Sequence, residues 1–130
     1  MDEVLEFLRS LPAFYLATED GDQPRVRPFG AACEFEGRIY LQTGKVKDVY
    51  RQIVANPKVE ICGFGDGTWL RVAATLVEDP RVEAQQALLD AFPDLKRMYA
   101  AGDGNTVVFY LTNATATFSS FEAGPKVVRF

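Results

Sequence analysis

The stretch VEICGFGDGTWLRVAATLV, residues 59–77, decides the fold class. Two runs rich in β-branched and aromatic residues, Val59–Phe64 and Thr68–Val77, flank Gly65-Asp66-Gly67, whose residues tolerate the backbone angles of a tight turn. The pattern predicts a β-hairpin whose second strand is long enough to belong to a barrel wall. We therefore expect an antiparallel sheet.

Further hairpins are predicted on the N-terminal side of this stretch. The run Phe14–Thr18 stops at the turn residues Glu19–Asp22, and the strand-like segment Arg25–Phe35 turns at Glu36-Gly37 and returns as Arg38–Thr43. Three strand-like runs lie near the C-terminus: Val107–Leu111, Thr115–Phe121 and Lys126–Phe130.

Three segments have the periodicity of amphipathic helices. The first ends at Pro12, the second at Asn56-Pro57 and the third at Pro93; the third begins at Asp79, which we expect to be an N-cap before Pro80. Their apolar positions are, in turn, Val4, Leu5, Leu8 and Leu11; Val46, Val49, Tyr50, Ile53 and Val54; and Val82, Leu88, Leu89 and Phe92. One further helical turn is expected between Asp94 and Tyr99.

The elements together predict a mainly β fold. Six to eight short antiparallel strands with two or three inserted helices are typical of a small barrel with helical covers, not of a parallel βαβ sheet. A length of 130 residues leaves little room for a second core, so we expect a single domain, residues 1–130.

Composition excludes several classes of function. A net charge of −4 opposes binding to nucleic acid, which requires many clustered cations. The absence of histidine removes Ser/His and Cys/His triads and His-ligated metals, so we expect no metal site.

The two cysteines, Cys33 and Cys62, lie in strand-like settings and are predicted to be buried free thiols. The acidic residues near the N-terminus and the lack of a long apolar run lead us to expect a cytoplasmic protein.

A strand with unusual composition is the first candidate binding surface. In Arg25-Val26-Arg27-Pro28-Phe29-Gly30-Ala31-Ala32, small residues follow two cations and a proline, and small side chains let a planar ligand approach the backbone closely. Guanidinium groups suit a phosphate or a heterocycle edge. A bent barrel strand whose arginines pair with carboxylates would give the same pattern.

Two more groups are candidates. Thr43-Gly44-Lys45-Val46-Lys47 joins a strand to a helix start, where free amides, a hydroxyl and two ammonium groups could hold a monophosphate; an ordinary turn with solvated lysines is the alternative. Trp69 and Arg71 face the same side of one strand and could contact a ligand, although core or interface packing is the default for a single tryptophan.

In order and spacing, these segments resemble a known family. Phe14–Thr18, Gly21–Pro28, Thr43–Lys47, Ala55–Val59 and Trp69–Arg71 are similar to the FMN-binding split-barrel family of pyridoxamine 5'-phosphate oxidase-like proteins, and most of all to short bacterial general stress and nitroimidazole-reductase-like members. The resemblance implies a six-stranded antiparallel split β-barrel with two to three covering helices. It also implies a homodimer with one FMN in each of two clefts between the subunits.

The resemblance assigns candidate cofactor-binding residues by position. Arg25, Val26, Arg27, Pro28 and Phe29 would line the flavin ring and ribityl chain, with Gln42 and Thr43 beside them; Lys47, together with Lys45 and Thr43, would hold the phosphate; Trp69 and Arg71 would approach the flavin of either subunit. No catalytic side chain is assigned. Without histidine, vitamin B6 oxidation and haem ligation are disfavoured.

The function expected from the resemblance is a flavin-dependent oxidoreductase that acts on a small planar substrate, with NAD(P)H as a candidate electron donor. Two alternatives stay open. One is a non-catalytic flavin-binding or stress-response module, and the other is a binder of another planar cofactor such as a deazaflavin.

Overall fold

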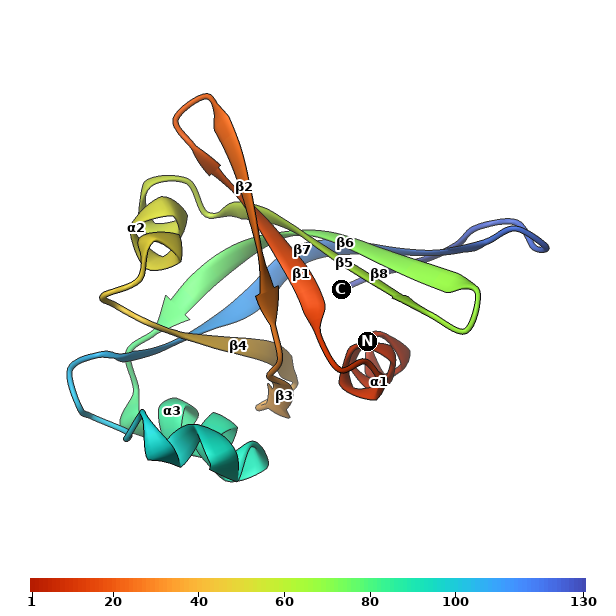
Figure 1. The fold of residues 1–130 in the computed structure, drawn as a ribbon. Helices are drawn as coiled ribbons and strands as arrows, with labels where there is room; N and C mark the ends of the chain where they lie inside the picture. Colours follow the sequence, from red (N-terminus) through yellow and green to blue (C-terminus); the bar gives the residue numbers. More distant parts are fainter.

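The computed structural model describes residues 1–130 as one eight-stranded antiparallel sheet with three α-helices and one 3-10 helix (Figure 1). In chain order the elements are α1 (Asp2–Ser10), β1 (Phe14–Asp20), β2 (Gln23–Phe29), β3 (Ala32–Phe35), β4 (Arg38–Gly44), α2 (Asp48–Ala55), β5 (Lys58–Gly65), β6 (Thr68–Asp79), α3 (Val82–Ala91), η1 (Pro93–Arg97), β7 (Thr106–Ser120) and β8 (Lys126–Arg129). None of the helices has the length and apolar character needed to span a membrane.

The sheet does not close into a full barrel. Its strand order is β2-β1-β5-β6-β7-β4-β3, with β8 paired to β7, so β2 and β3 are edges with one neighbour each. These edges are consecutive in the chain, because the run Arg25–Phe35, predicted to be strand-like throughout, is interrupted at Gly30-Ala31 and forms two strands. The predicted split-barrel fold class is confirmed, and the eight strands include β3 and β8, of four residues each.

The edge strand β2 contains two prolines. It pairs with β1 without interruption from Gln23 to Phe29, although Pro24 and Pro28 have no N–H to donate. A strand residue directs its N–H and C=O to the same neighbour, so these prolines are tolerated where they face the free edge.

The predicted hairpin turns form where the sequence places them. Glu36 and Gly37 have φ values of 50° and 78°, and Asp66 and Gly67 have values of 51° and 72°. Two consecutive residues with positive φ match the right-handed twist of the flanking strands, and glycine in the second position adopts this conformation without steric cost.

The C-terminal strands differ from the prediction. The runs Val107–Leu111 and Thr115–Phe121 form one strand, β7, of 15 residues, instead of two. Asn113 has a φ of 49°, and the pairing with β6 shifts between Ala73 and Thr75, so an irregularity bends the strand without ending it. This long strand pairs with β6, β4 and β8 and joins the two halves of the sheet.

Helices α1 and α2 cover the main core. Val4, Leu5 and Leu8 of α1 and Val49 and Ile53 of α2 pack with the inward residues of the sheet. The predicted apolar face of α2 is wrong at both ends. Val46 precedes the helix and is 84% exposed, and Val54 is 61% exposed, because the buried face instead includes Gln52.

A pair of glycines in β5 makes room for the segment that follows α1. A Cβ atom at Gly63 would lie 2.5 Å from Leu11 Cδ1, and one at Gly65 would lie 2.8 Å from Leu11 Cδ2. Both distances are far below van der Waals contact, so a larger residue at either position would force the Leu11 side chain to shift.

Helix α3 packs on a second, smaller cluster formed with β3, β4 and β7.

Asp79 is not the N-cap of α3, because β6 continues through Asp79 and the helix begins at Val82. The carboxylate of Asp79 instead accepts hydrogen bonds from the Tyr40 hydroxyl (2.7 Å) and from the side chain and backbone N–H of Arg81. The Arg81 guanidinium lowers the pKa of Asp79 to about 2, and burial raises the pKa of Tyr40 to about 12. Val82, predicted on the buried face, is 50% exposed.

The two cysteines lie in different environments. Cys33 is buried against α3, and desolvation raises its pKa to about 11. Cys62 is exposed, contrary to the prediction, because β5 alternates and places Cys62 on the outward face of the sheet.

Candidate functional site

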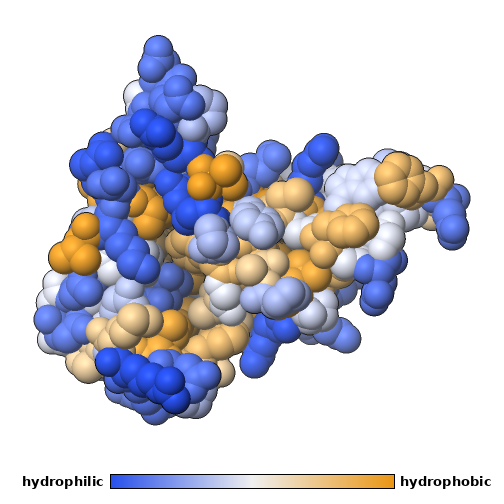
Figure 2. Space-filling model, viewed as in Figure 1, coloured by the Kyte–Doolittle hydropathy of each residue, from blue (hydrophilic) through white to orange (hydrophobic).

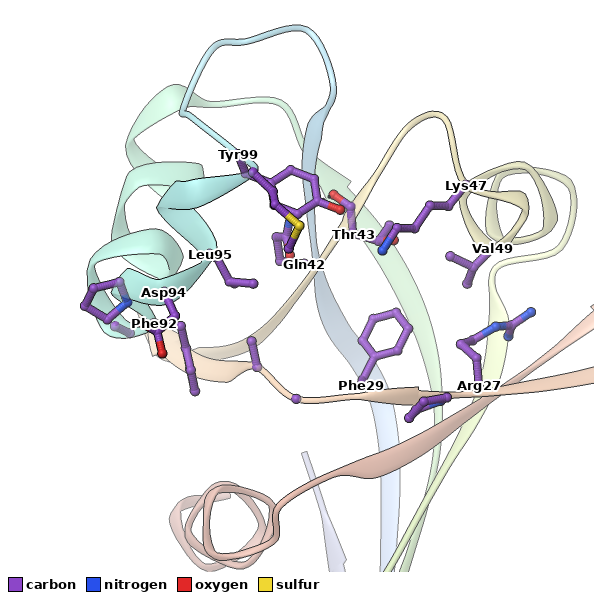
Figure 3. Close-up of a pocket in the computed structure, with 16 residues that line it drawn as sticks. Arg27, Phe29, Gln42, Thr43, Lys47, Val49, Phe92, Asp94, Leu95 and Tyr99 are labelled. Atoms are coloured by element: carbon purple, nitrogen blue, oxygen red, sulfur yellow. Dashed lines mark hydrogen bonds between the residues drawn. The ribbon is translucent and has the colours of Figure 1, made fainter.

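A pocket of about 420 Å³ lies between the end of β2 with the Gly30-Ala31 connection, the end of β4 and the helical segment 91–99 (Figure 3). Its walls come from the end of β2 and the connection to β3, the end of β4, the start of α2, and the end of α3 with η1. The lining residues are Arg27, Pro28, Phe29, Gly30, Ala31, Gln42, Thr43, Lys47, Val49, Ala91, Phe92, Pro93, Asp94, Leu95, Met98 and Tyr99.

One end of the pocket is rich in hydrogen-bond donors. Thr43, Lys47 and Tyr99 converge there, and their polar atoms point toward one another in Figure 3. Thr43 and Tyr99 are 4% and 8% exposed, and neither hydroxyl makes a hydrogen bond within the protein, whereas Gln42 donates to the Thr43 carbonyl at 3.0 Å. No fully enclosed side-chain polar atom lacks a partner, so both hydroxyls must reach open space, which is the pocket.

The loop that carries Lys47 is held by the loop before β7. Asn105 accepts from Lys45 N–H through its backbone carbonyl (2.8 Å) and from Val46 N–H through its side chain (3.2 Å). Asp103 in turn accepts three backbone N–H bonds, from Ala100, Asn105 and Thr106, and these lower the pKa of its carboxyl group. The loop before β7 therefore fixes the backbone of residues 45 and 46 beside the donor-rich end.

The opposite end of the pocket is apolar. Phe29, Gly30 and Ala31 form one wall, and Phe92, Leu95 and Met98 of the helical segment face them. Asp94 is the only carboxylate in the lining, and it lies on the helical side (Figure 3). The small residues at 30 and 31 leave the backbone open to a flat ligand, as the sequence suggested.

Arg27 lines the pocket, but its guanidinium is engaged in a network between β1, β2 and α2. It donates to the Leu16 carbonyl (3.1 Å), the Thr18 hydroxyl (2.8 Å) and the Gln52 side-chain carbonyl (2.6 Å). Thr18 donates to the same Gln52 oxygen at 2.6 Å. Desolvation lowers the pKa of Arg27, which nevertheless stays cationic at neutral pH.

The structure brings six of the sequence-predicted residues together in this pocket: Arg27, Pro28, Phe29, Gln42, Thr43 and Lys47. The other five lie outside it: Arg25, Val26, Lys45, Trp69 and Arg71. Arg25 pairs with Asp20 near the β1–β2 turn, Val26 is 67% exposed on the outward face, and the Lys45 side chain lies near Tyr50.

Trp69 and Arg71 share the outward face of β6, as predicted, far along the sheet from the pocket of their own chain. The Trp69 ring packs on Phe121, with centroids 5.1 Å apart. These residues therefore contact no ligand in the pocket of their own chain.

Sequence reasoning missed the wall formed by residues 91–99. The predicted helical turn exists as η1, but from the sequence its side chains were assigned no role in a binding site. The signal that could have found them is the cluster Phe92, Leu95, Met98 and Tyr99 directly after a helix that ends at proline, because η1 buries none of its own residues.

The residues of the pocket fit a ligand with a phosphate at one end and a flat ring at the other. The donor-rich end offers an ammonium group and two unpartnered hydroxyls, which suit an anion, and the other end offers apolar walls. No three His, Cys, Asp or Glu side chains lie close enough together to hold a metal ion.

Comparison with known proteins identifies the family. The family model described as pyridoxamine 5'-phosphate oxidase matches residues 1–92 of the chain. The chain belongs to the pyridoxamine 5'-phosphate oxidase family. A search of the curated proteins found no match.

Solved structures of this pyridoxamine 5'-phosphate oxidase-like fold include a NimC/NimA family protein from Clostridium acetobutylicum. It is 41% identical, with a TM-score of 0.96, and the match covers 100% of this chain and 92% of that one. General stress protein 26 from Bacillus anthracis is 16% identical, with a TM-score of 0.77 and coverage of 98% and 97%. An F420 reductase is 21% identical, with a TM-score of 0.59 and coverage of 82% and 90%. The last two share the fold.

Proposed function

We propose that the protein is an FMN-binding flavoprotein that acts as a flavin-dependent oxidoreductase on a small planar substrate. The observation that carries the proposal is the uneven distribution of polar and apolar groups between the two ends of the pocket. Cationic and hydroxyl donors gather at one end and apolar walls at the other, as a flavin with a terminal phosphate requires. Family membership supports a flavin-type cofactor.

In this proposal the phosphate lies at the donor-rich end, near Lys47, Thr43 and the uncapped N-terminus of α2. The ring lies along Phe29, Gly30 and Ala31, and Phe92 and Leu95 of the helical segment shield its other side from water. When bound, the flavin would supply the redox chemistry by accepting and releasing electrons. The chain's own residues would bind the cofactor, orient it and admit the substrate.

Arg27 would act indirectly in this arrangement. Its guanidinium already donates hydrogen bonds to Leu16, Thr18 and Gln52. Arg27 would therefore hold β2 in place while the main chain of residues 27–31 contacts the ligand. Its positive charge would still favour an anionic ligand in the same pocket.

We also propose a cytoplasmic homodimer. The outward face of the sheet exposes apolar side chains on neighbouring strands, and Figure 2 shows apolar residues along the arm that carries the β7–β8 turn. A second copy of the chain would cover them, and Trp69 and Arg71 would then approach the flavin bound to the partner subunit. The exposed fractions are 50% for Tyr15, 67% for Val26, 64% for Phe64, 88% for Phe121 and 44% for Val127.

The first test is flavin binding. Purified protein would be mixed with FMN, desalted and scanned for the flavin absorption bands, and we expect about one FMN per chain. Lys47→Ala should weaken FMN binding by roughly 1.5–3 kcal/mol, because it removes a charge-assisted phosphate contact. Lys45→Ala is the matched control, since Lys45 lies outside the pocket. Equal FMN affinity for both variants would contradict the proposed phosphate position.

The second test concerns turnover. NADH or NADPH should reduce the bound flavin under anaerobic conditions, followed by reoxidation with candidate acceptors. Bound flavin that neither nucleotide nor a reductase partner reduces would indicate a storage or sensing module instead. If the protein retained a deazaflavin in preference to FMN, the deazaflavin would be its cofactor instead.

A further inference from the structure

We propose that the phenol of Tyr99 donates a hydrogen bond to the phosphate of the bound flavin, and that Gly44 is the position that admits the Tyr99 ring to the site. This inference rests on the proposed function and adds to it a binding residue from a different part of the chain. It starts from the hydroxyl that the protein itself leaves unpartnered.

The exposure of Tyr99 is unusual for a phenol with no partner. The residue is only 8% exposed, and buried tyrosine hydroxyls usually find a hydrogen-bond partner. Each of the three other buried or half-buried tyrosines interacts with a charged side chain of the protein. Tyr40 donates to Asp79 and Tyr50 donates to Glu78, whereas the ring of Tyr110 packs against the guanidinium of Arg38. The Tyr99 hydroxyl instead faces the pocket, so its natural partner is a ligand.

The position of the ring is determined by the backbone around it. Tyr99 follows η1, its N–H donates to the Leu95 carbonyl at 2.9 Å, and its ring lies against Gly44 at the end of β4. A Cβ atom at Gly44 would lie 3.1 Å from Tyr99 Cε1 and 3.1 Å from the side-chain atoms of Asn105. Glycine at this position therefore lets the ring approach β4 and direct its hydroxyl toward Thr43 (Figure 3).

The chemistry at this point favours an anion. The Lys47 ammonium lies 6.0 Å from the centre of the Tyr99 ring, and the unpartnered Thr43 hydroxyl lines the same end. A phosphate oxygen could accept from all three groups, which are donors that come from β4, the start of α2 and the end of η1. Such a phosphate would connect the helical segment to the sheet through hydrogen bonds. Because Phe92, Leu95 and Met98 belong to this segment, their positions would be fixed as well.

The experiment compares FMN with riboflavin, which has the same ring but no phosphate. Tyr99→Phe removes one oxygen that makes no hydrogen bond within the protein, so the variant should fold with unchanged stability. We expect its FMN affinity to fall about tenfold to a hundredfold, as for a hydrogen bond to a charged group, while riboflavin affinity stays the same. Tyr50→Phe, which removes a phenol outside the pocket, should leave both affinities unchanged.

Gly44→Ala provides an independent variant, because its methyl group would lie 3.1 Å from both the Tyr99 ring and the Asn105 side chain, so these two must shift slightly while the Tyr99 hydroxyl is retained. It should lower FMN affinity more than riboflavin affinity, and Tyr99→Phe should add little to it. If Tyr99→Phe binds FMN as the wild type does, or loses affinity for riboflavin equally, the inference is wrong and the proposed function stands. A wild-type protein that binds no FMN overturns both.

Discussion

The hydrogen-bond network around Gln52 gives the sharpest test of how the pocket is held. The Gln52 side-chain carbonyl accepts from Thr18 and from Arg27, at 2.6 Å in each case, and Gln52 is only 3% exposed. Gln52→Met preserves the size of the side chain and removes the acceptor. The Thr18 hydroxyl and one guanidinium N–H are then left without this partner.

The magnitude follows from the environment of these donors. An unsatisfied buried polar group costs about 1–3 kcal/mol, and the partly exposed Arg27 recovers some of its loss from water, so we expect Gln52→Met to lower the free energy of unfolding by roughly 2–4 kcal/mol. For a chain of this length that corresponds to a fall in Tm of roughly 6–20 °C.

Thermal and urea unfolding followed by circular dichroism would measure the change. Gln52→Glu retains oxygen acceptors and directs a carboxylate at Arg27, so it should recover at least half of the lost stability at neutral pH. Arg51→Met is the matched control on the same helix; it removes an exposed ion pair with Asp20 and should cost less than about 1 kcal/mol. The reasoning fails if Gln52→Met unfolds like the wild type, or if the glutamate variant is no more stable than the methionine variant.

Three further predictions concern packing, pH and assembly. Gly63→Ala should destabilise the protein by about 1–3 kcal/mol through the clash with Leu11, and Leu11→Ala should cost less in that background than alone, as a double-mutant cycle would measure. The pKa of Asp79 is lowered to about 2 in the fold from an ordinary value of 3.8, so its stabilising contribution is complete above about pH 4 and disappears as the pH falls toward 2. The stability difference between wild type and Asp79→Asn, from urea unfolding at several pH values, should shrink over that interval; a constant difference would contradict the assignment. Val26→Glu should shift the proposed dimer toward monomer in sedimentation velocity, whereas Val82→Glu, on α3, should not; a monomeric wild type would remove the basis of this prediction.

Local signals in the sequence predicted the hairpins and helices well. Glu36-Gly37 and Asp66-Gly67 could be identified because positive φ at two successive residues restricts the residue types that fit. Alternation correctly placed Trp69 and Arg71 on one face of a strand. These features depend on neighbours in the chain, which the sequence displays directly.

Features that depend on distant partners could not be predicted in the same way. Asp79 has the sequence context of a helix cap, but the hydrogen bond from Tyr40, 39 residues away, and the extra length of β6 determine its role. Gln52 lies on the buried face of α2 only because Thr18 and Arg27 meet it there.

Only part of the candidate site could be predicted, because some of its residues stand out in the local sequence and others reach the pocket only through long-range packing. Residues of β2, β4 and the following loop were found because their composition is locally unusual, with cations, small residues and a helix start close together. The wall from Phe92 to Tyr99 has an ordinary composition and reaches the pocket only through the packing of α3 on β3, β4 and β7.

The prolines of β2 have a consequence for solubility. An edge strand can recruit a strand from another molecule, because such pairing needs a regular row of donors and acceptors along the free edge. In β2, Pro24 and Pro28 face that edge, so of the alternating positions 24, 26 and 28 only Val26 retains an N–H group. The edge keeps its carbonyl groups and loses most of its donors. The β2 edge of the open sheet, which lies beside the pocket, is thereby disfavoured for the addition of a further strand.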